Sequence, residues 1–216
     1  MRKLLFRLIP GIRSSPLPRG PVFGRGLVFF SFLGLLTSFP FADARAVPDT
    51  RCSPIVTLVG YVEQYSRPSQ PFPEALRIGR ALLGASRKSR LPLYMLVALA
   101  QEESSFNPEA VNEASQDYGL FQIHYPFWKK YFRKRVGGND RRVRRADIMR
   151  VEVNAHMAAD ILSYDLKLSG GDVVQMLGRY SGRTGRSHEK YIRNILRYSL
   201  AFKKYESAGK GSCRVP

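Results

Sequence analysis

The sequence is poor in the residues that bind metals and that build disulfide networks. Its 216 residues include two cysteines, Cys52 and Cys213, three histidines and one tryptophan. So few cysteines, with the histidines scattered along the chain, argue against a metal centre and against a disulfide-rich scaffold. No internal repeat is present, so a repeat architecture is not indicated. We therefore expect one folded domain with no metal and no cofactor.

Long apolar runs are also scarce, and the most apolar stretch lies near the N-terminus. Residues 1–25 carry six basic side chains and no acid, and the run GLVFFSFLGLLTSFPF follows at 26–41. This run is short for a membrane span and contains Pro40. Small residues at 42–46 offer two cleavage sites. We predict that residues 1–46 are a signal peptide and that the protein is periplasmic or secreted, with an uncleaved anchor as the alternative.

Acidic side chains are outnumbered by basic ones, 17 to 35, which gives a net charge of +18. Removal of residues 1–46 takes away seven basic residues and Asp43, and leaves 28 basic against 16 acidic residues, or +12. Basic stretches at 129–135 and 141–145 could contact nucleic acid, but an exported protein rarely meets it. We expect anionic cell-wall material as the counterpart, with a solvated surface that has no partner as the alternative.

The two cysteines lie near the ends of the exported part. An even pair in an exported chain usually forms a disulfide, so we predict a Cys52–Cys213 bond that joins both ends. Lipid modification of Cys52 is the alternative, although the preceding Asp-Thr-Arg lacks the small and apolar residues that such a site uses.

The exported part divides by composition into a proline-rich N-terminal extension, a main domain and a tail, at residues 47–73, 74–206 and 207–216. Apolar residues at helical spacing predict five helices in the main domain, at 74–89, 89–108, 146–170, 172–182 and 188–206. In the last helix we expect four side chains to face inward: Tyr191, Ile195, Leu196 and Leu200. Only the turn-rich stretch 108–124 leaves room for strands, as a small β-hairpin. The predicted fold is mainly α.

The segment 89–108, SRLPLYMLVALAQEESSFNP, is apolar on both sides until it reaches two acids. Ser89 is a candidate N-cap, and the proline at its end stops the helix. Glu103 falls within the strongest apolar stripe, whereas Glu102 points about 100° away to a more solvated side. A carboxyl among apolar neighbours has a raised pKa, which a general acid near neutral pH requires. The alternative is a helix that simply ends in solvated acids.

Two motifs after this helix carry a resemblance to a known family. ESSFNPEAV at 103–111, followed by DYGLFQI at 117–123, resembles the lytic transglycosylase (SLT-type) branch of the lysozyme-like superfamily. Phe106 stands at the aromatic position, and Phe121 replaces the usual methionine. The resemblance continues to about residue 205 and implies an α+β lysozyme-like catalytic domain.

The resemblance also implies a mechanism and a set of site residues. Lytic transglycosylases use one glutamate, first as acid and then as base, and let the C6 hydroxyl of the sugar attack to give a 1,6-anhydro product; here that residue is Glu103. Substrate binding is implied for Ser104, Gly119, Phe121, Gln122, Tyr180 and Asp117. Asn154 resembles the asparagine of the third block. Around Tyr180 the chain departs from the family, because Ser181 replaces an asparagine and Arg179 an alanine.

Several alternatives remain open at this point. Asp117 is either a structural turn residue or, as in animal-type lysozymes, a second catalytic carboxylate that would make the protein a hydrolysing muramidase. An inactive cell-wall-binding module is a further alternative. Some transglycosylases associated with secretion or conjugation machinery also carry Asp-Tyr-Gly, which suggests such an apparatus as a partner besides peptidoglycan glycan strands.

Overall fold

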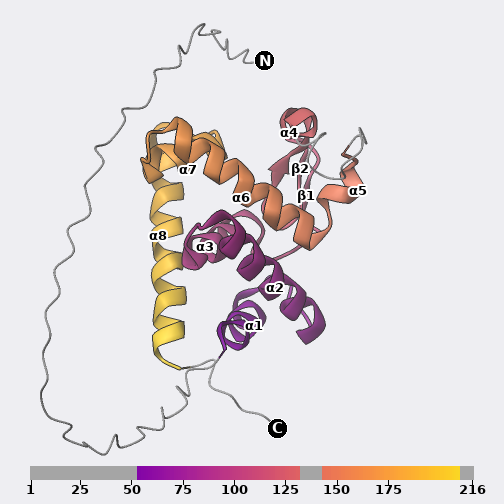
Figure 1. Cartoon of the computed structure of the whole chain (residues 1–216), viewed down its shortest axis with the longest axis vertical. Helices are drawn as coiled ribbons and strands as arrows, with labels where there is room; N and C mark the ends of the chain where they lie inside the picture. The colour runs from indigo at the N-terminus through magenta and orange to yellow at the C-terminus, as the bar shows by residue number, and fades with distance from the viewer. Residues whose placement is uncertain (1–52, 132–142, 210–216) are drawn as a thin grey trace, which may run out of the picture. The chain divides into compact units, whose positions relative to one another are not determined.

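The computed structural model describes residues 53–131 and 143–209 (Figure 1). The predicted signal peptide, Cys52, Cys213 and parts of both basic stretches, residues 132–135 and 141–142, lie outside the described residues. The helices are α1 (Pro54–Tyr65), α2 (Phe72–Ser89), α3 (Leu93–Ser104), α4 (Tyr125–Tyr131), α5 (Arg145–Ile148), α6 (Val151–Leu168), α7 (Val173–Ser181) and α8 (Gly185–Ser207).

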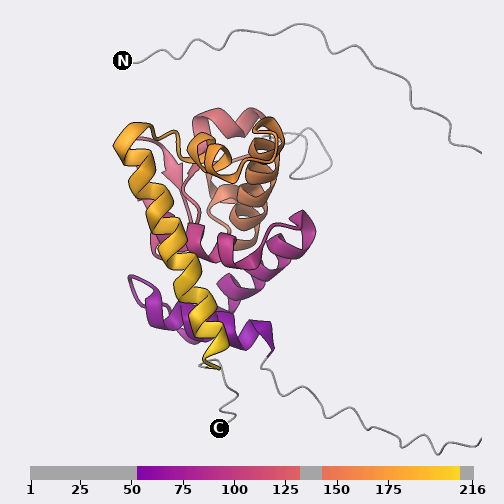
Figure 2. The same cartoon turned by 90° about the vertical axis from the view of Figure 1, so that its left-hand side faces the viewer.

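Helix α3 lies at the centre of the domain because it is apolar on every side. Its residues 95–100 are all buried, and it packs against α2 and along α8. Helix α8 runs past α3, with α7 near its first turn and α1 near its last (Figures 1 and 2). The C-terminal turn of α3, which carries Glu103, is thereby enclosed by the start of α8.

The N-terminal extension contributes to the same core. Leu58, Tyr61 and Val62 of α1 are fully buried. The ring of Tyr61 meets the rings of Phe106 and Phe202 edge to face, with centroids 6.1 and 5.1 Å apart. Such edge-to-face pairs add to the apolar area that they bury. Helix α1 therefore joins the segment after α3 to the end of α8.

The sheet is small and antiparallel, and it lies where strands were expected. Strands β1 (Val111–Asn112), β2 (Asp117–Tyr118) and β3 (Ile123–His124) pair in that order. The prediction of a mainly α fold with a minor β element at 108–124 is confirmed, with one more strand than a hairpin.

The predicted start of the central helix was wrong. Ser89 is the last residue of α2, and its hydroxyl donates to the carbonyl of Ala85 at 2.7 Å instead of capping α3. Arg90 adopts a left-handed conformation at φ 62°, and Pro92 follows as the N-cap of α3. A left-handed residue ends a helix, so α2 and α3 are separate helices joined by a sharp turn.

The single helix predicted at 146–170 is divided into α5 and α6. Arg150 has an extended ψ of 126° and precedes α6 as its N-cap. The carbonyl of Ile148 accepts from the side chain of Asn154 at 2.9 Å, which replaces a backbone partner within a continuous helix. The break exists because Asn154 takes up this carbonyl.

The expected inward face of α8 was half right. Tyr191 and Ile195 are buried, but Leu196 and Leu200 are 57% and 62% exposed. The packing face continues through Phe202 and Tyr205. At about 100° per residue, Leu196 and Leu200 lie roughly 130–180° from the middle of that face, on the opposite side of the helix. Leu196 instead lines an apolar cavity of about 430 Å³ bounded by α3, α6, α7 and α8, which Glu103 does not line. Among the described residues, no helix is long and apolar enough to cross a membrane.

Asn154 fastens the sheet to α6. Its Oδ1 accepts from the amide of Phe121 at 2.8 Å, and its Nδ2 donates to the carbonyls of Tyr118 and Ile148, each at 2.9 Å. Gly119 has φ +77°, and a Cβ there would lie 2.5 Å from this Nδ2. The close approach of backbone and amide requires glycine at this position. Asn154 thus determines where the Gly-Leu-Phe-Gln loop lies.

Replacing Asn154 with alanine should lower the free energy of unfolding by about 2–4 kcal/mol, because the buried amide of Phe121 and two carbonyls lose their partner. Chemical denaturation would measure this. Asn112→Ala is the control, since Asn112 is an exposed residue of β1 whose side chain accepts one hydrogen bond, from the amide of Ser115 at 3.3 Å. Equal effects of the two substitutions would contradict the role of Asn154.

Candidate active site

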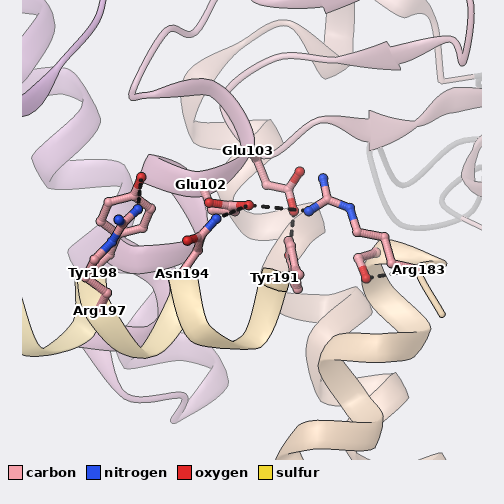
Figure 3. Close-up of polar contacts among 8 residues, drawn as sticks. Glu102, Glu103, Arg183, Tyr191, Asn194, Arg197 and Tyr198 are labelled. Atoms are coloured by element: carbon pink, nitrogen blue, oxygen red, sulfur yellow. Dashed lines mark hydrogen bonds and ion pairs between the residues drawn. The ribbon is translucent and has the colours of Figure 1, made fainter. Parts of the chain in front are cut away.

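The candidate catalytic carboxyl lies at the end of the central helix. Glu103 is in the last turn of α3, and the helix stops because Ser105 and Phe106 both have positive φ, 52° and 61°. Phe106 is fully buried and anchors the chain after this turn. The backbone therefore turns directly beyond Glu103, with its side chain directed toward α8 (Figure 3).

Glu103 is deeply but not completely buried, and it accepts one strong hydrogen bond. The hydroxyl of Tyr191 on α8 donates to its Oε1 at 2.5 Å (Figure 3). Burial raises the pKa of Glu103 to about 7, while the bond from Tyr191 and the charge of Arg183 act in the opposite direction. The charges of Glu102 and Asp117 raise the pKa further. The raised pKa predicted from the helix pattern is confirmed.

Glu102 and Glu103 differ in their partners, and not in exposure to solvent as predicted. The side chain of Glu102 is only 11% exposed, so the expectation of a solvated acid was wrong. Its Oε1 lies 3.3 Å from both Arg183 Nη1 and Asn194 Nδ2 (Figure 3). Glu102 is an ion-paired carboxylate, whereas Glu103 has a neutral partner and apolar surroundings.

Three of these contacting residues escaped the sequence reasoning. Tyr191 was expected only as a core residue, and Arg183 and Asn194 were not singled out. The guanidinium of Arg183 lies 4.5 Å from the centroid of the Tyr191 ring. No local pattern marks these residues, since each reaches Glu102 or Glu103 from more than 80 positions away. The one available signal was the hydroxyl of Tyr191 at an inward-facing position of α8, and Arg183, in the turn before α8, gave none.

Ser104 and Gln122 both hold the loop between β2 and β3. The hydroxyl of Ser104 donates to the carbonyl of Leu120 at 2.7 Å, which ties the end of α3 to this loop. The amide nitrogen of Gln122 donates to the carbonyls of Ala110 and Gly119, at 3.1 and 3.0 Å. The Gln122 amide nitrogen therefore joins the loop to the residue that precedes β1, and a substrate contact of Gln122 stays a prediction.

Phe121 and Tyr180 pack behind the loop. The ring of Phe121 is fully buried, so its contribution here is to packing, and a substrate contact stays a prediction. Tyr180 donates to the carbonyl of Phe121 at 2.8 Å. Burial and the nearby charge of Glu103 hold the pKa of Tyr180 well above its usual value, so the hydroxyl stays protonated. Tyr191, not Tyr180, donates to the acid.

Asp117 lies on β2 and pairs across the sheet with His124, whose Nδ1 is 2.9 Å from its Oδ1. Its side chain is 25% exposed, and its charge reaches Glu103 strongly enough to raise that pKa. The expectation of a structural turn residue was wrong in that Asp117 belongs to a strand, and its role as a second carboxylate stays a prediction.

Arg179 does not face the site. Its Nε lies 3.3 Å from Oδ1 of Asp165, whose side chain is 7% exposed. The departure from the family pattern at this position therefore serves the packing of α7 on α6. Among the described residues, no group of three histidine, cysteine or acidic side chains lies close enough to hold a metal ion.

The raised pKa of Glu103 predicts a pH-dependent stability. The folded pKa is about 7 and the ordinary value 4.5, so folding binds a proton between these values and stability falls as pH rises through them. The protein should lose about 3 kcal/mol of its unfolding free energy between these pH values. Glu103→Gln, which mimics the protonated acid, should remove this loss.

Urea denaturation at several pH values would test this expectation. Glu109→Gln is the matched control, since Glu109 is exposed and offers the same change of charge. The difference in stability between Glu103→Gln and the unchanged protein should grow from pH 4.5 to pH 7. A difference that does not vary with pH would contradict burial as the cause of the raised pKa.

A comparison of the sequence with known protein families gives a match that includes the residues around Glu103. The family model "Transglycosylase SLT domain" matches residues 81–195, which run from within α2 to α8 and include Glu103, Gln122, Tyr180 and Tyr191. No curated protein matches the chain. Members of this family are lytic transglycosylases, which act on the peptidoglycan of the cell wall. The match covers more than half of the sequence, and the chain therefore belongs to the transglycosylase SLT domain family.

Proposed function

We propose that the protein is an exported lytic transglycosylase that cleaves the β-1,4 bond between N-acetylmuramic acid and N-acetylglucosamine in peptidoglycan. The product would carry a 1,6-anhydromuramoyl end. The observation that supports this best is the environment of Glu103: it is buried, its pKa is raised to about 7, and one tyrosine orients it. Half of such a group is protonated near neutral pH, and it can serve as acid and then as base.

In the first step Glu103 donates its proton to the glycosidic oxygen while the bond from that oxygen to C1 of the muramic acid breaks. Because Tyr191 donates to Oε1, the proton of the acid lies on Oε2, the oxygen left to face the substrate. The developing positive charge on C1 is then stabilised by the newly formed carboxylate.

In the second step the carboxylate of Glu103 takes the proton of the C6 hydroxyl, and O6 bonds to C1 of the same sugar. Glu103 regains its proton, and no water is consumed. Ser104, Gly119, Gln122 and the backbone around Phe121 would form the wall of the glycan groove on the sheet side. We further propose that the setting is a local opening of the wall for a secretion or conjugation apparatus, on the resemblance of the Asp-Tyr-Gly block.

A hydrolysing muramidase is the second candidate function. The observation that supports it is that Asp117 lies near enough to Glu103 to affect its pKa. This carboxylate acts on the pKa of Glu103 and could stabilise or activate a water at C1. Its pairing with His124 supports a structural role instead. An inactive wall-binding module would keep the fold without releasing any product.

Glu103→Gln should abolish release of soluble muropeptides from purified sacculi, because the amide cannot donate the proton, while the fold persists. Glu102→Gln should lose much less, because the carboxyl of Glu102 is paired with Arg183 and Asn194 and is not the proposed acid. Turbidity of sacculi and chromatography of the products would measure both. Equal losses at the two positions would refute the assignment of Glu103, and turbidity unchanged by the native protein would favour the wall-binding module.

The mass of the released muropeptides separates the two enzymatic candidates. Products of transglycosylation should be one water lighter than the corresponding products of hydrolysis, because O6 replaces water as the nucleophile. Mass spectrometry would show this directly, and a muramidase digest of the same sacculi is the control. Products that match the control digest would identify a hydrolase, and Asp117→Asn should then abolish activity.

A further inference from the structure

The residues next to the acid suggest how Tyr191 is kept in place. Arg183 follows Gly182, the left-handed C-cap of α7 at φ 63°. Its backbone N–H donates to the hydroxyl of Ser181 at 3.3 Å. The backbone of Arg183 is thus held by the turn that ends α7, immediately before α8 begins.

The side chain of Arg183 touches two neighbours of the acid at once. Nη1 lies 3.3 Å from Oε1 of Glu102, and the guanidinium carbon lies 4.5 Å from the ring centroid of Tyr191. Figure 3 shows the guanidinium beside the carboxyl of Glu103 and close to this ring, with its contact to Glu102 drawn as a dashed line. A guanidinium over an aromatic face is attracted by the ring electrons. Arg183 therefore connects α3 to the tyrosine on α8 that donates to Glu103.

Glu102 is held firmly enough to fix Arg183. Its side chain is 11% exposed, and Asn194 donates to the same oxygen that Arg183 contacts, at 3.3 Å. A carboxylate this buried needs a charged partner, and among the described residues Arg183 is the cation that pairs with it. Arg183 itself is 41% exposed, so the pair joins a partly exposed cation to a largely buried carboxylate.

We propose that Arg183 and Glu102 are positioning residues, which together hold the ring of Tyr191 so that its hydroxyl stays on Glu103. Arg183 forms no hydrogen bond with Glu103 among the contacts of the described residues, so it acts through Tyr191 and through its charge. The proposal rests on the proposed function only in treating Glu103 as the acid. It gives a role to Glu102, Ser181 and Arg183, which the resemblance leaves without one.

The positive charge of Arg183 predicts in which direction the pKa of Glu103 should change when Arg183 is replaced. The groups that act on the pKa of Glu103 from the surrounding elements are Glu102 on α3, Asp117 on β2, Arg183 in the α7–α8 turn and Tyr191 on α8. Tyr180 on α7 is also near, and the charge of Glu103 raises its pKa. Arg183 is the cation among them and lowers the pKa of Glu103. Its removal should raise that pKa, so the protonated acid should persist to higher pH.

The experiment compares Arg183→Met with Arg193→Met in the full chain. Arg193 lies on α8, is 69% exposed and pairs with Glu189, so its loss changes net charge equally without touching the site. The ¹³C signal of the Glu103 carboxyl, followed by NMR against pH, should titrate about half a unit higher in Arg183→Met than in Arg193→Met. With soluble glycan chains as substrate, the pH at which kcat falls on the alkaline side should rise by the same amount.

Two further variants separate positioning from substrate contact. Arg183→Met should lower kcat about tenfold with little change in KM, and Arg183→Lys should recover part of the loss, because a lysine can still pair with Glu102. In the Tyr191→Phe background, Arg183→Met should lower kcat by no more than about twofold, because the hydroxyl that it positions is gone.

An equal pKa of the Glu103 carboxyl in Arg183→Met and Arg193→Met would overturn the proposal. So would a loss of kcat in the variant with both Arg183→Met and Tyr191→Phe that equals the product of the two single losses. A rise in KM with unchanged kcat would identify Arg183 as a substrate contact instead. If the native protein releases no muropeptides, the proposed function fails, but the NMR titration still decides whether Arg183 acts on Glu103.

Discussion

A tyrosine hydroxyl that donates to a buried carboxyl is the interaction on which this site depends. Burial alone would leave Glu103 free to turn within its pocket, and a proton on either oxygen would be equally available. The bond from Tyr191 at 2.5 Å selects one oxygen as acceptor and leaves the other for the proton. It also moderates the effect of burial on the pKa, so that the group stays near 7. The packing of α3 along α8 makes this contact possible.

The second requirement is a fixed position for the loop between β2 and β3, which Ser104 ties to the end of α3. The loop between β2 and β3 is short and has little regular structure of its own, so it depends on side chains from elsewhere. Asn154, Ser104 and Tyr180 each bond to its backbone, from α6, α3 and α7. Three helices therefore hold one loop, and the acid and the loop keep a constant relation because α3 carries both Glu103 and Ser104.

Arg179 and Ser181, the two residues next to Tyr180 that differ from the family pattern, each have a partner in the structure. Arg179 turns away from the site and pairs with Asp165. Ser181 accepts from the backbone of Arg183, and Arg183 pairs with Glu102. A change from the usual residue at each position is thus matched by a partner elsewhere in the chain. In this altered block Tyr180 donates to the carbonyl of Phe121 in the loop between β2 and β3.

Much of the fold followed from periodicity. The buried character of α3, the apolar setting of Glu103 and the place of the strands were readable, because helix faces and turn residues are local properties of the chain. The motifs with Glu103 and Gln122 identified the family for the same reason. Helix boundaries were less accurate: Ser89 ends a helix instead of starting one, and the break before α6 depends on a side chain six residues away from the carbonyl that it takes up.

The sequence by itself determined which carboxyl is surrounded by apolar side chains, since that depends on spacing within one helix. Only the tertiary structure decided that Tyr191 orients this carboxyl, that Glu102 is paired instead of solvated, and that Leu196 and Leu200 remain exposed. These outcomes depend on how α8 is rotated and placed against α3 and α7. That placement arises from the packing of many side chains from distant parts of the chain, so it cannot be predicted from any short stretch of the sequence.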